Sequence, residues 1–247
     1  MIDIHCHIIP CIDDGAESLE MTKVMLAAAK KDGINAILAS SHYFEGYEEA
    51  YRPLFKTVSD MAGDYGISIY PSCEHDLSFL SGNSKVFPAC NGIFILVDIC
   101  SPYIPDYIPD LIFDYELKGN KLIFVHPERL FGIKDLPKLT GLAGQGALFQ
   151  INAASILGRN GRTARKMSFR MLEDGLVHYV ATDAHSPGRR GFYMSEARQY
   201  VCGKFGEDVA RRLFESNPGR LINGDIPKDI PAVKLSLLQR LSRMITG

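Results

Sequence analysis

Two pairs of potential metal ligands lie near opposite ends of the chain. His5 and His7 are separated by one residue in a strand-like run, and an acidic turn follows at residues 13–15. Asp183 and His185 show the same spacing. Because the side chains of a strand alternate between its two faces, the members of each pair point the same way. Converging imidazole and carboxylate groups are typical metal ligands, so the sequence predicts a metal site.

Most of the further His and acidic residues lie at or just after the C-terminal ends of other predicted strands, as does Asn152. They complete a set of nine candidate ligands, namely His5, His7, Asp14, His42, Glu74, Asp98, His126, Asp183 and His185. A set of nitrogen and oxygen ligands suits Mn, Fe or Zn, whereas thiolates would indicate structural zinc. Nine ligands exceed the need of one ion, so we expect two or three ions bridged by carboxylates. Such clusters typically hydrolyse phosphoesters or amides with a metal-bound hydroxide.

Other polar residues have simpler interpretations. A lone His at a strand end is usually only hydrogen-bonded, so the prediction depends on the joint pattern. His75 and His178 fall outside that pattern, and we expect them to have packing roles. The basic stretch 159–166 is more typical of a solvated helix start than of a phosphate site. Three cysteines adjoin candidate ligands but alternate away from them, and we expect them in the core: Cys6, Cys73 and Cys100.

Composition narrows the class of protein. With 247 residues, of which 46% are hydrophobic, the chain can form one large core. A net charge of -2 gives no basic field for nucleic acid. The six Cys residues include no CxxC pair, and the start of the chain lacks a leader pattern, which favours a reduced, cytoplasmic protein. No apolar run reaches the ~18 residues of a membrane span. The CxxxxxR, GxxxxGK, GxSxG and HExxH motifs are all missing.

Strand-like and helix-like segments alternate along the chain. Apolar runs predict seven strands, at 1–7, 34–39, 67–73, 93–99, 122–125, 147–151 and 177–182. Amphipathic patterns predict helices at 18–31, with Ser18 as the cap, and at 47–65, 105–118, 134–143, 163–174 and 193–216. Repeated βα units with apolar strands indicate an α/β fold with a parallel sheet, and closure into a barrel suits this length. The candidate ligands would then meet at one mouth.

Several short motifs occur in order along the chain: Ile2-Asp3-Ile4-His5-Cys6-His7, Asp13-Asp14-Gly15, Ser41-His42, Val125-His126-Pro127-Glu128-Arg129, Ala181-Thr182-Asp183-Ala184-His185 and Asn217-Pro218-Gly219-Arg220. Together they resemble the PHP (polymerase and histidinol phosphatase) superfamily. They are most similar to the bacterial manganese-dependent protein-tyrosine phosphatases of capsule and exopolysaccharide loci. The resemblance implies a distorted (β/α)7 barrel over residues 1–224.

The resemblance also implies three divalent metal ions, with manganese expected first and iron or zinc as alternatives. One ion would be held by His5, His7, Glu74 and Asp183, a second by Glu74, Asp98 and His126, and a third by Asp14, His42 and His185. Arg129 and Arg190 would contact the phosphate, and His42 is a further candidate catalytic residue. Arginine suits this role because its planar fork of donors matches phosphate oxygens.

The implied activity is hydrolysis of phosphotyrosine by a metal-dependent phosphomonoesterase. The expected substrate is the phosphorylated Tyr-rich tail of a bacterial tyrosine kinase that governs capsule or exopolysaccharide export. Peripheral association with that membrane-bound kinase and a homo-oligomer are further expected partnerships. Two alternatives remain open: a small-molecule phosphatase similar to histidinol phosphatase, and a non-catalytic regulatory module. The sequence departs from the family at Asp98, where Glu is usual, and at residues 43–45, where basic residues are common.

The C-terminal segment 225–247 lies beyond the resemblance. Its apolar residues recur at three- and four-residue steps, which predicts an amphipathic helix: Leu235, Leu238, Leu241 and Ile245. We expect this helix to pack on the barrel or on another subunit. The alternative is that its basic residues dock it on the inner membrane face or on the kinase.

Overall fold

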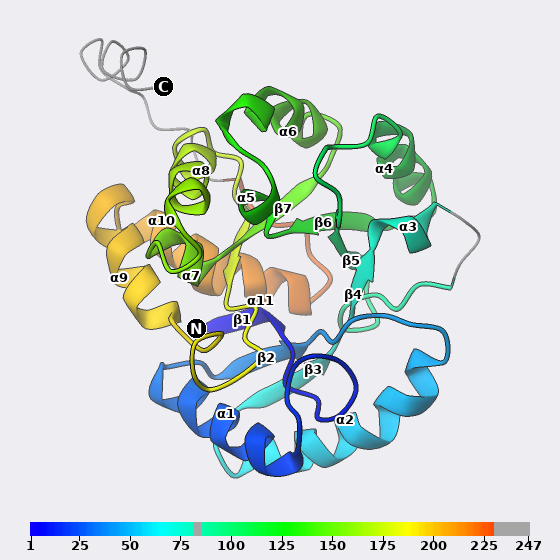
Figure 1. Ribbon diagram of the computed structural model, residues 1–247, viewed down its shortest axis with the longest axis vertical. Coiled ribbons are helices and arrows are strands. Elements are labelled where there is room, and N and C mark those ends of the chain that lie inside the picture. The colour runs from blue at the N-terminus through cyan, green and yellow to red at the C-terminus, as the bar shows by residue number, and fades with distance from the viewer. Residues whose placement is uncertain (82–84, 230–247) are drawn as a thin grey trace.

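The computed structural model describes residues 1–81 and 85–229 and contains two parallel sheets. The first has the order β1-β2-β3, formed by Ile2–Cys6, Ala36–Ala39 and Ser68–Pro71. The second has the order β4-β5-β6-β7-β8, formed by Glu74–Asp76, Phe94–Asp98, Lys121–Val125, Leu148–Asn152 and Tyr179–Ala181. The predicted parallel α/β architecture is therefore confirmed (Figure 1).

Isolated parallel bridges connect the two sheets where their strands end. One pairs Cys6 with Ala184, and the other pairs His42 with Glu74. The sequence predicted one strand at 67–73, whereas the structure ends β3 at Pro71 and begins β4 at Glu74. Proline has no N–H to continue a ladder, which explains the end of β3. The described residues thus form eight strands in two sheets, where the sequence predicted seven.

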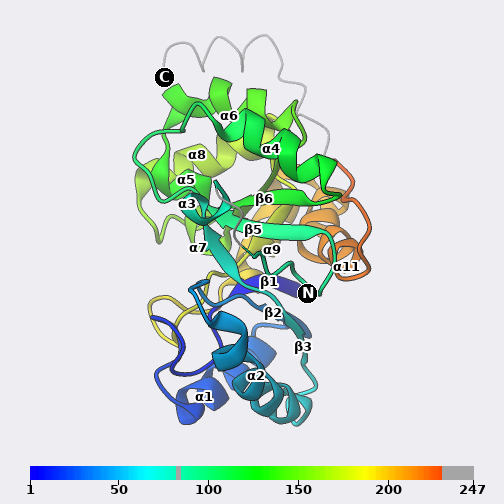
Figure 2. The ribbon, with the colours of Figure 1, turned by 90° about the vertical axis from the view of Figure 1, so that its right-hand side faces the viewer.

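Helices flank both sheets. In Figures 1 and 2, α1 (Leu19–Lys31) and α2 (Tyr47–Gly63) lie on the three-stranded sheet, apart from the helices around the five-stranded sheet. The latter include α3 (Leu77–Leu80), α4 (Ile108–Leu117), α5 (Pro127–Leu130), the 3-10 turn η1 (Ile133–Asp135), α6 (Leu136–Ala143), α7 (Ala153–Ile156) and α8 (Arg162–Glu173). The hydroxyl of Ser18 accepts a hydrogen bond from the N–H of Met21, which confirms the predicted cap.

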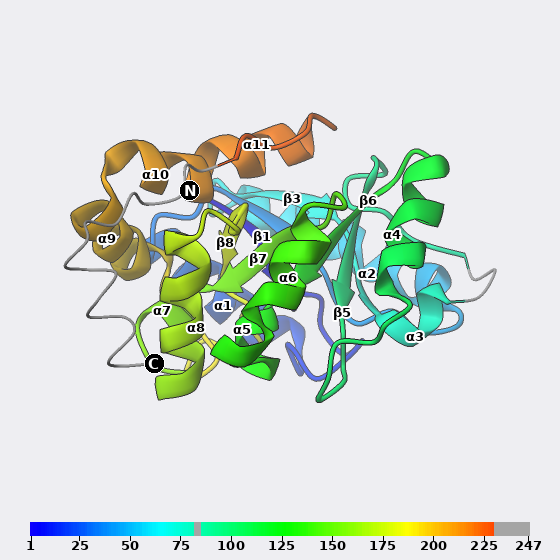
Figure 3. The same ribbon diagram turned by 90° about the horizontal axis from the view of Figure 1, so that it is seen from above.

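The C-terminal helical region differs from its prediction. The sequence predicted one helix at 193–216, but the structure has α9 (Met194–Phe205), α10 (Glu207–Arg211) and a π-helical turn η2 (Arg212–Ser216). Gly206 separates α9 from α10 with φ +92°, a conformation that glycine adopts without strain. The last helix, α11 (Asn217–Ile222), follows directly, and Figure 3 shows α9, α10 and α11 along one side of the molecule.

The motif at 217–220 anchors the chain after α11. The Asn217 side chain donates hydrogen bonds to the carbonyls of His178 and Lys228 and accepts one from the Lys228 N–H. No helix begins in residues 225–229, and the rest of the predicted amphipathic helix, 230–247, lies outside the described residues. Of the helices in the described part, none is long and apolar enough to cross a bilayer.

The core contains two clusters. A large cluster packs the helices against the outer faces of the sheets, and a smaller one lies between the strands, with Ile4, Leu38, Leu96 and Ile123 fully buried. Cys6 and Cys73 are buried as predicted. Cys100 is exposed, contrary to prediction, because β5 ends at Asp98 and the strand alternation does not continue beyond it.

The two His residues outside the ligand set have the predicted packing roles. His75 accepts a hydrogen bond from the N–H of Phe87 at 3.2 Å, and His178 accepts one from the N–H of Phe149 at 3.1 Å. Both rings are buried. Neither is therefore needed to explain the polar cluster at the strand ends.

Candidate metal centre

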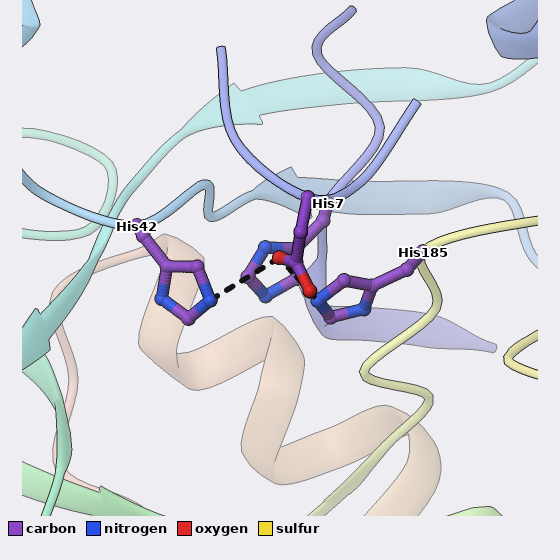
Figure 4. Close-up of side chains that lie close together, drawn as sticks. His7, His42 and His185 are labelled. Carbon is purple, nitrogen blue, oxygen red and sulfur yellow. Dashed lines mark ion pairs between the residues drawn. The ribbon is translucent and has the colours of Figure 1, made fainter. Parts of the chain in front are cut away.

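The structure brings all nine predicted ligands together at one end of the strands. They form four overlapping groups whose ligand atoms lie within 4.8 Å of one another. The groups are His5, His7 and Glu74; His5, His126 and Asp183; Glu74, Asp98 and His126; and His7, Asp14, His42 and His185. The last group matches the expected third site with His7 added, and Figure 4 shows the rings of His7, His42 and His185 close together.

Glu74 lies at the centre of this cluster. Its Oε2 atom is 3.3 Å from Nε2 of both His5 and His7 and 3.1 Å from Nδ1 of His42. That oxygen is buried and makes no hydrogen bond within the described residues, whereas Oε1 lies 2.9 Å from Nε2 of His126. A buried carboxylate oxygen faced by three ring nitrogens without hydrogen-bond geometry fits the coordination of a cation.

The histidine rings are oriented so that one nitrogen of each faces the centre. His5 Nδ1 donates to Oε1 of Gln150 at 3.1 Å, and His7 Nδ1 donates to Oδ2 of Asp13 at 2.7 Å. Their Nε2 atoms then lie only 3.2 Å apart. A hydrogen bond at one ring nitrogen fixes which nitrogen is left for a metal. This is the arrangement expected of a pair of metal-binding histidines.

Electrostatics around His7 favours positive charge. Although burial opposes the imidazolium form, the carboxylates of Asp13 and Glu74 raise the pKa of His7 to about 10. Burial likewise opposes charge on Glu74, but His5 and the other imidazoles hold its pKa well below the usual range. A site that retains a proton this firmly also attracts cations, so protons and metal ions compete for it.

Sequence reasoning did not assign two residues that position these ligands. Asp13 also accepts the backbone N–H of His42 at 2.9 Å, so it orients two candidate ligands. Gln150 donates to Oδ1 of Asn152 at 2.8 Å, and Asn152 donates to Oδ2 of Asp183 at 2.9 Å. Asp13 stands beside a predicted ligand in the acidic turn, and Gln150 is a polar residue within an apolar strand. These two positions are the sequence signals that could have indicated the positioning roles of Asp13 and Gln150.

Backbone contacts between β1 and the chain after β8 place Asp183. Buried Asp3 accepts hydrogen bonds from the N–H and the hydroxyl of Thr182, and burial raises the pKa of Asp3 to about 6. The N–H of Asp183 donates to the carbonyl of His5 at 2.8 Å. Asp183 itself has φ +54°, a left-handed conformation that Asp tolerates better than most residues. This turn directs its carboxylate toward His5 and His7.

Asp98 makes the loosest contact in the centre. Its Oδ1 atom lies 4.0 Å from Nδ1 of His126 and accepts the N–H of Cys100 at 3.1 Å. The Nδ1 atom of His126 is buried and has no hydrogen-bond partner in the described part of the chain. Asp98 is the position at which this sequence departs from the family pattern, where Glu is usual.

Two arginines border the centre. Arg129 donates to Oδ2 of Asp183, and Arg190 donates to Oδ2 of Asp14 at 2.8 Å and to Nε2 of His185 at 2.6 Å. Both line a cavity of about 230 Å³ with six of the candidate ligands, namely His42, Glu74, Asp98, His126, Asp183 and His185, and with Leu130. Glu128 accepts the N–H of Asn152 and the hydroxyl of Ser155, which fixes the short helix that carries Arg129.

The arrangement is similar to that of known proteins. YwqE of Bacillus subtilis, a tyrosine-protein phosphatase, is 30% identical over 246 residues, which cover 94% of this chain and 95% of that protein. The tyrosine-protein phosphatase CpsB of Streptococcus pneumoniae is 28% identical over 241 residues, covering 90% of this chain and 98% of CpsB.

Solved structures agree with these relatives. A crystal structure from work on YwqE of Bacillus subtilis and CpsB of Streptococcus pneumoniae, described as metal-dependent tyrosine phosphatases, has a TM-score of 0.86 and 29% identity. The match covers 96% of this chain and all of that one. The model of the family described as "Capsular polysaccharide synthesis, CpsB/CapC" matches residues 1–223. Because that match includes every residue of the centre described above, the chain belongs to the CpsB/CapC family of capsular polysaccharide synthesis.

Proposed function

We propose that this protein is a metal-dependent protein-tyrosine phosphatase. The observation that carries the proposal is the environment of Glu74, whose buried Oε2 atom is faced by the nitrogens of His5, His7 and His42. In a cluster with a purely structural role, we would expect that oxygen to accept a hydrogen bond. The phosphatase activity of the relatives in the family supports the same conclusion.

Three divalent ions, with manganese expected first and iron or zinc as alternatives, fit the donors present. His5, His7, Glu74 and Asp183 would hold one ion, Glu74, Asp98 and His126 a second, and Asp14, His42 and His185 a third, with His7 close enough to contribute to the last. Bound metal would supply Lewis-acid stabilisation of phosphoryl oxygens and a nucleophile at neutral pH.

The arginines would bind and orient the phosphoryl group. Arg129 forms an ion pair with Asp183, and Arg190 forms one with Asp14. Both arginines line the 230 Å³ cavity. Their guanidinium groups would donate paired hydrogen bonds to the equatorial oxygens as charge develops there. His42 is half exposed at the same opening, where it would border the substrate. The phenolate of tyrosine, with a pKa of about 10, leaves without strong acid assistance.

We also propose a substrate, a cellular location and a closed barrel for this protein. The substrate would be the phosphorylated Tyr-rich tail of a bacterial tyrosine kinase that regulates capsule or exopolysaccharide synthesis, in the cytoplasm, with peripheral association with that kinase. A homo-oligomer belongs to the same proposal. The bridges Cys6–Ala184 and His42–Glu74 support treating the two sheets as parts of one distorted (β/α)7-type barrel.

The decisive experiment combines metal analysis with activity. Purified protein is analysed for Mn, Fe and Zn and assayed on a phosphotyrosine peptide before and after chelation, with metal added back. We expect at least two ions per chain, loss of activity on chelation and recovery with Mn. Faster turnover of histidinol phosphate would instead support a small-molecule phosphatase. Fewer than two ions and no turnover would support a non-catalytic module.

A further inference from the structure

A second cavity, of about 910 Å³, opens beside the metal centre. It shares Arg129, Asp183 and Arg190 with the smaller cavity, so the two cavities are adjacent. Its outer wall comes from the loop before α8 and the loop before α9. Its lining includes the side chains of Arg129, Arg159, Arg189, Arg190 and Tyr193, and we call this space the arginine cavity.

The charges lining the arginine cavity are strongly unbalanced. Four arginines line it, whereas Asp183 is the single carboxylate among its lining residues. Asp183 already faces Arg129 and the histidines of the centre. Arg189 therefore presents positive charge beyond what the metal centre uses, and Arg159 adds to it although it also forms an ion pair with Glu196. In a partly enclosed space this charge interacts more strongly with an anion than it would in open water.

Arg159 is held in place more firmly than a solvated helix residue. Its guanidinium lies over the ring of Tyr193, 4.1 Å from the centroid, and one Nη atom contacts Oε2 of Glu196 at 3.3 Å. Helix α8 begins at Arg162, so Arg159 lies in the loop before the helix and not at a helix start. Stacking on an aromatic face leaves the other N–H donors of Arg159 available.

Arg189 is the second arginine of the outer wall and lies on the loop before α9. It is exposed, and within residues 1–81 and 85–229 it has no ion pair or side-chain hydrogen bond. Its neighbour Arg190 is engaged by Asp14 and His185. An unpaired arginine at the wall of a cavity is free to bind a ligand without first breaking an internal contact.

We propose that the arginine cavity is an anion subsite for the substrate. It would bind an acidic side chain, carboxylate or phosphoryl, that lies close in sequence to the phosphotyrosine whose phosphate occupies the metal centre. The inference rests on the proposed phosphatase function and adds a specificity determinant to it. Adjacent residues of an extended peptide are spaced by about 3.3–3.6 Å, so a peptide of a few residues is long enough to reach both adjacent cavities. An apolar side chain there would desolvate the guanidinium groups without compensation.

The test uses three phosphotyrosine peptides and one small substrate. The peptides carry Ala, Glu or a second phosphotyrosine beside the target residue. We expect p-nitrophenyl phosphate, which has no neighbouring residue, not to contact Arg159 and Arg189. The variants are Arg159→Gln combined with Arg189→Gln, Arg189→Gln alone, and the control Arg211→Gln, which removes an exposed arginine on α10. Thermal unfolding verifies that each variant is folded. Arg189→Gln alone keeps the test available if the double variant fails to fold.

We expect the wild-type metal-loaded enzyme to favour the anionic peptides about tenfold in kcat/KM, a difference of about 1.4 kcal/mol. The double variant should reduce this preference to less than about twofold, with the loss mainly in KM and with turnover of p-nitrophenyl phosphate unchanged. Arg211→Gln should keep the full preference. Rising salt should weaken the preference in the wild type.

Two results would overturn the subsite: equal kcat/KM for all three peptides in the wild type, or an unchanged preference in the double variant. The ratio between the Glu and the phosphotyrosine peptide assigns the occupant as carboxylate or phosphoryl. Failure of the proposed protein-tyrosine phosphatase function gives a different result, because none of the three phosphotyrosine peptides, the Ala peptide included, would then be hydrolysed.

Discussion

Asp13 and His7 form a buried pair in which Nδ1 of the imidazole lies 2.7 Å from Oδ2 of the carboxylate. The pair fixes the His7 ring so that its other nitrogen faces Glu74 and His5. Oδ2 of Asp13 also accepts the N–H of His42. One carboxylate outside the nine predicted ligands therefore positions two of them, and this relationship leads to the first prediction.

Replacing this carboxylate by Asp13→Asn should weaken metal binding without removing a ligand. Partners that orient a metal-bound His typically contribute 10–100-fold in metal affinity. We expect a loss of about that size in a Mn²⁺ titration followed by calorimetry. Asp64→Asn, at an exposed position after α2, serves as the control. Unchanged affinity in Asp13→Asn would contradict the positioning role.

Removing a central ligand should abolish activity while leaving the fold intact. We expect His5→Ala and Asp183→Asn each to lower phosphotyrosine hydrolysis by more than about a hundredfold, because both groups face the shared centre. Asn is chosen at 183 because it tolerates the positive φ found there. Circular dichroism checks the fold. Activity within tenfold of the wild type would refute the ligand assignment.

The two arginines of the centre should not tolerate lysine. Arg129→Lys and Arg190→Lys keep the charge but lose the paired donors that match phosphate oxygens, so we expect kcat/KM to fall at least about tenfold. Arg52→Lys, an exposed residue paired with Glu48, is the matched control. Wild-type kcat/KM in both variants would show that these residues do not bind the phosphoryl group.

Asp98→Glu tests the departure from the family pattern. The carboxylate of Asp98 reaches only to 4.0 Å from Nδ1 of His126, and one more methylene would bring it closer. We expect higher metal occupancy, or activity at a lower Mn²⁺ concentration, in elemental analysis after dialysis against limiting metal. Asp114→Glu, on the exposed face of α4, is the control. An unchanged or reduced occupancy would mean that the surroundings are adapted to Asp.

His75 should make the fold sensitive to acid. Burial lowers the pKa of His75 from 6.5 to about 4, so between these values the unfolded chain binds a proton that the folded chain does not. Stability therefore falls as the pH falls, by about 2 kcal/mol between pH 6.5 and pH 5 at 1.36 kcal/mol per unit. His75→Gln should be less stable at pH 8 but show a shallower decline toward pH 5 in urea unfolding. A decline as steep as that of the wild type would be inconsistent with this account.

The sequence determined the chemistry of the centre. Strand alternation places His5 and His7 on one face, and most of the remaining ligands lie at or just after the C-terminal ends of predicted apolar strands. These are local regularities, because the period of a strand and the end of an apolar run depend on neighbouring residues alone. The parallel architecture follows from the same repetition of βα units.

Only the tertiary structure decided which distant groups meet. The contacts of His5 with Gln150 and of Arg159 with Tyr193 join segments far apart in sequence, and no local pattern encodes such partners. The division into two sheets and the break at Gly206 likewise depend on backbone pairing and φ values that a run of apolar residues does not reveal. Packing of whole elements fixes these choices, because most buried polar groups find their hydrogen-bond partners only in the folded chain.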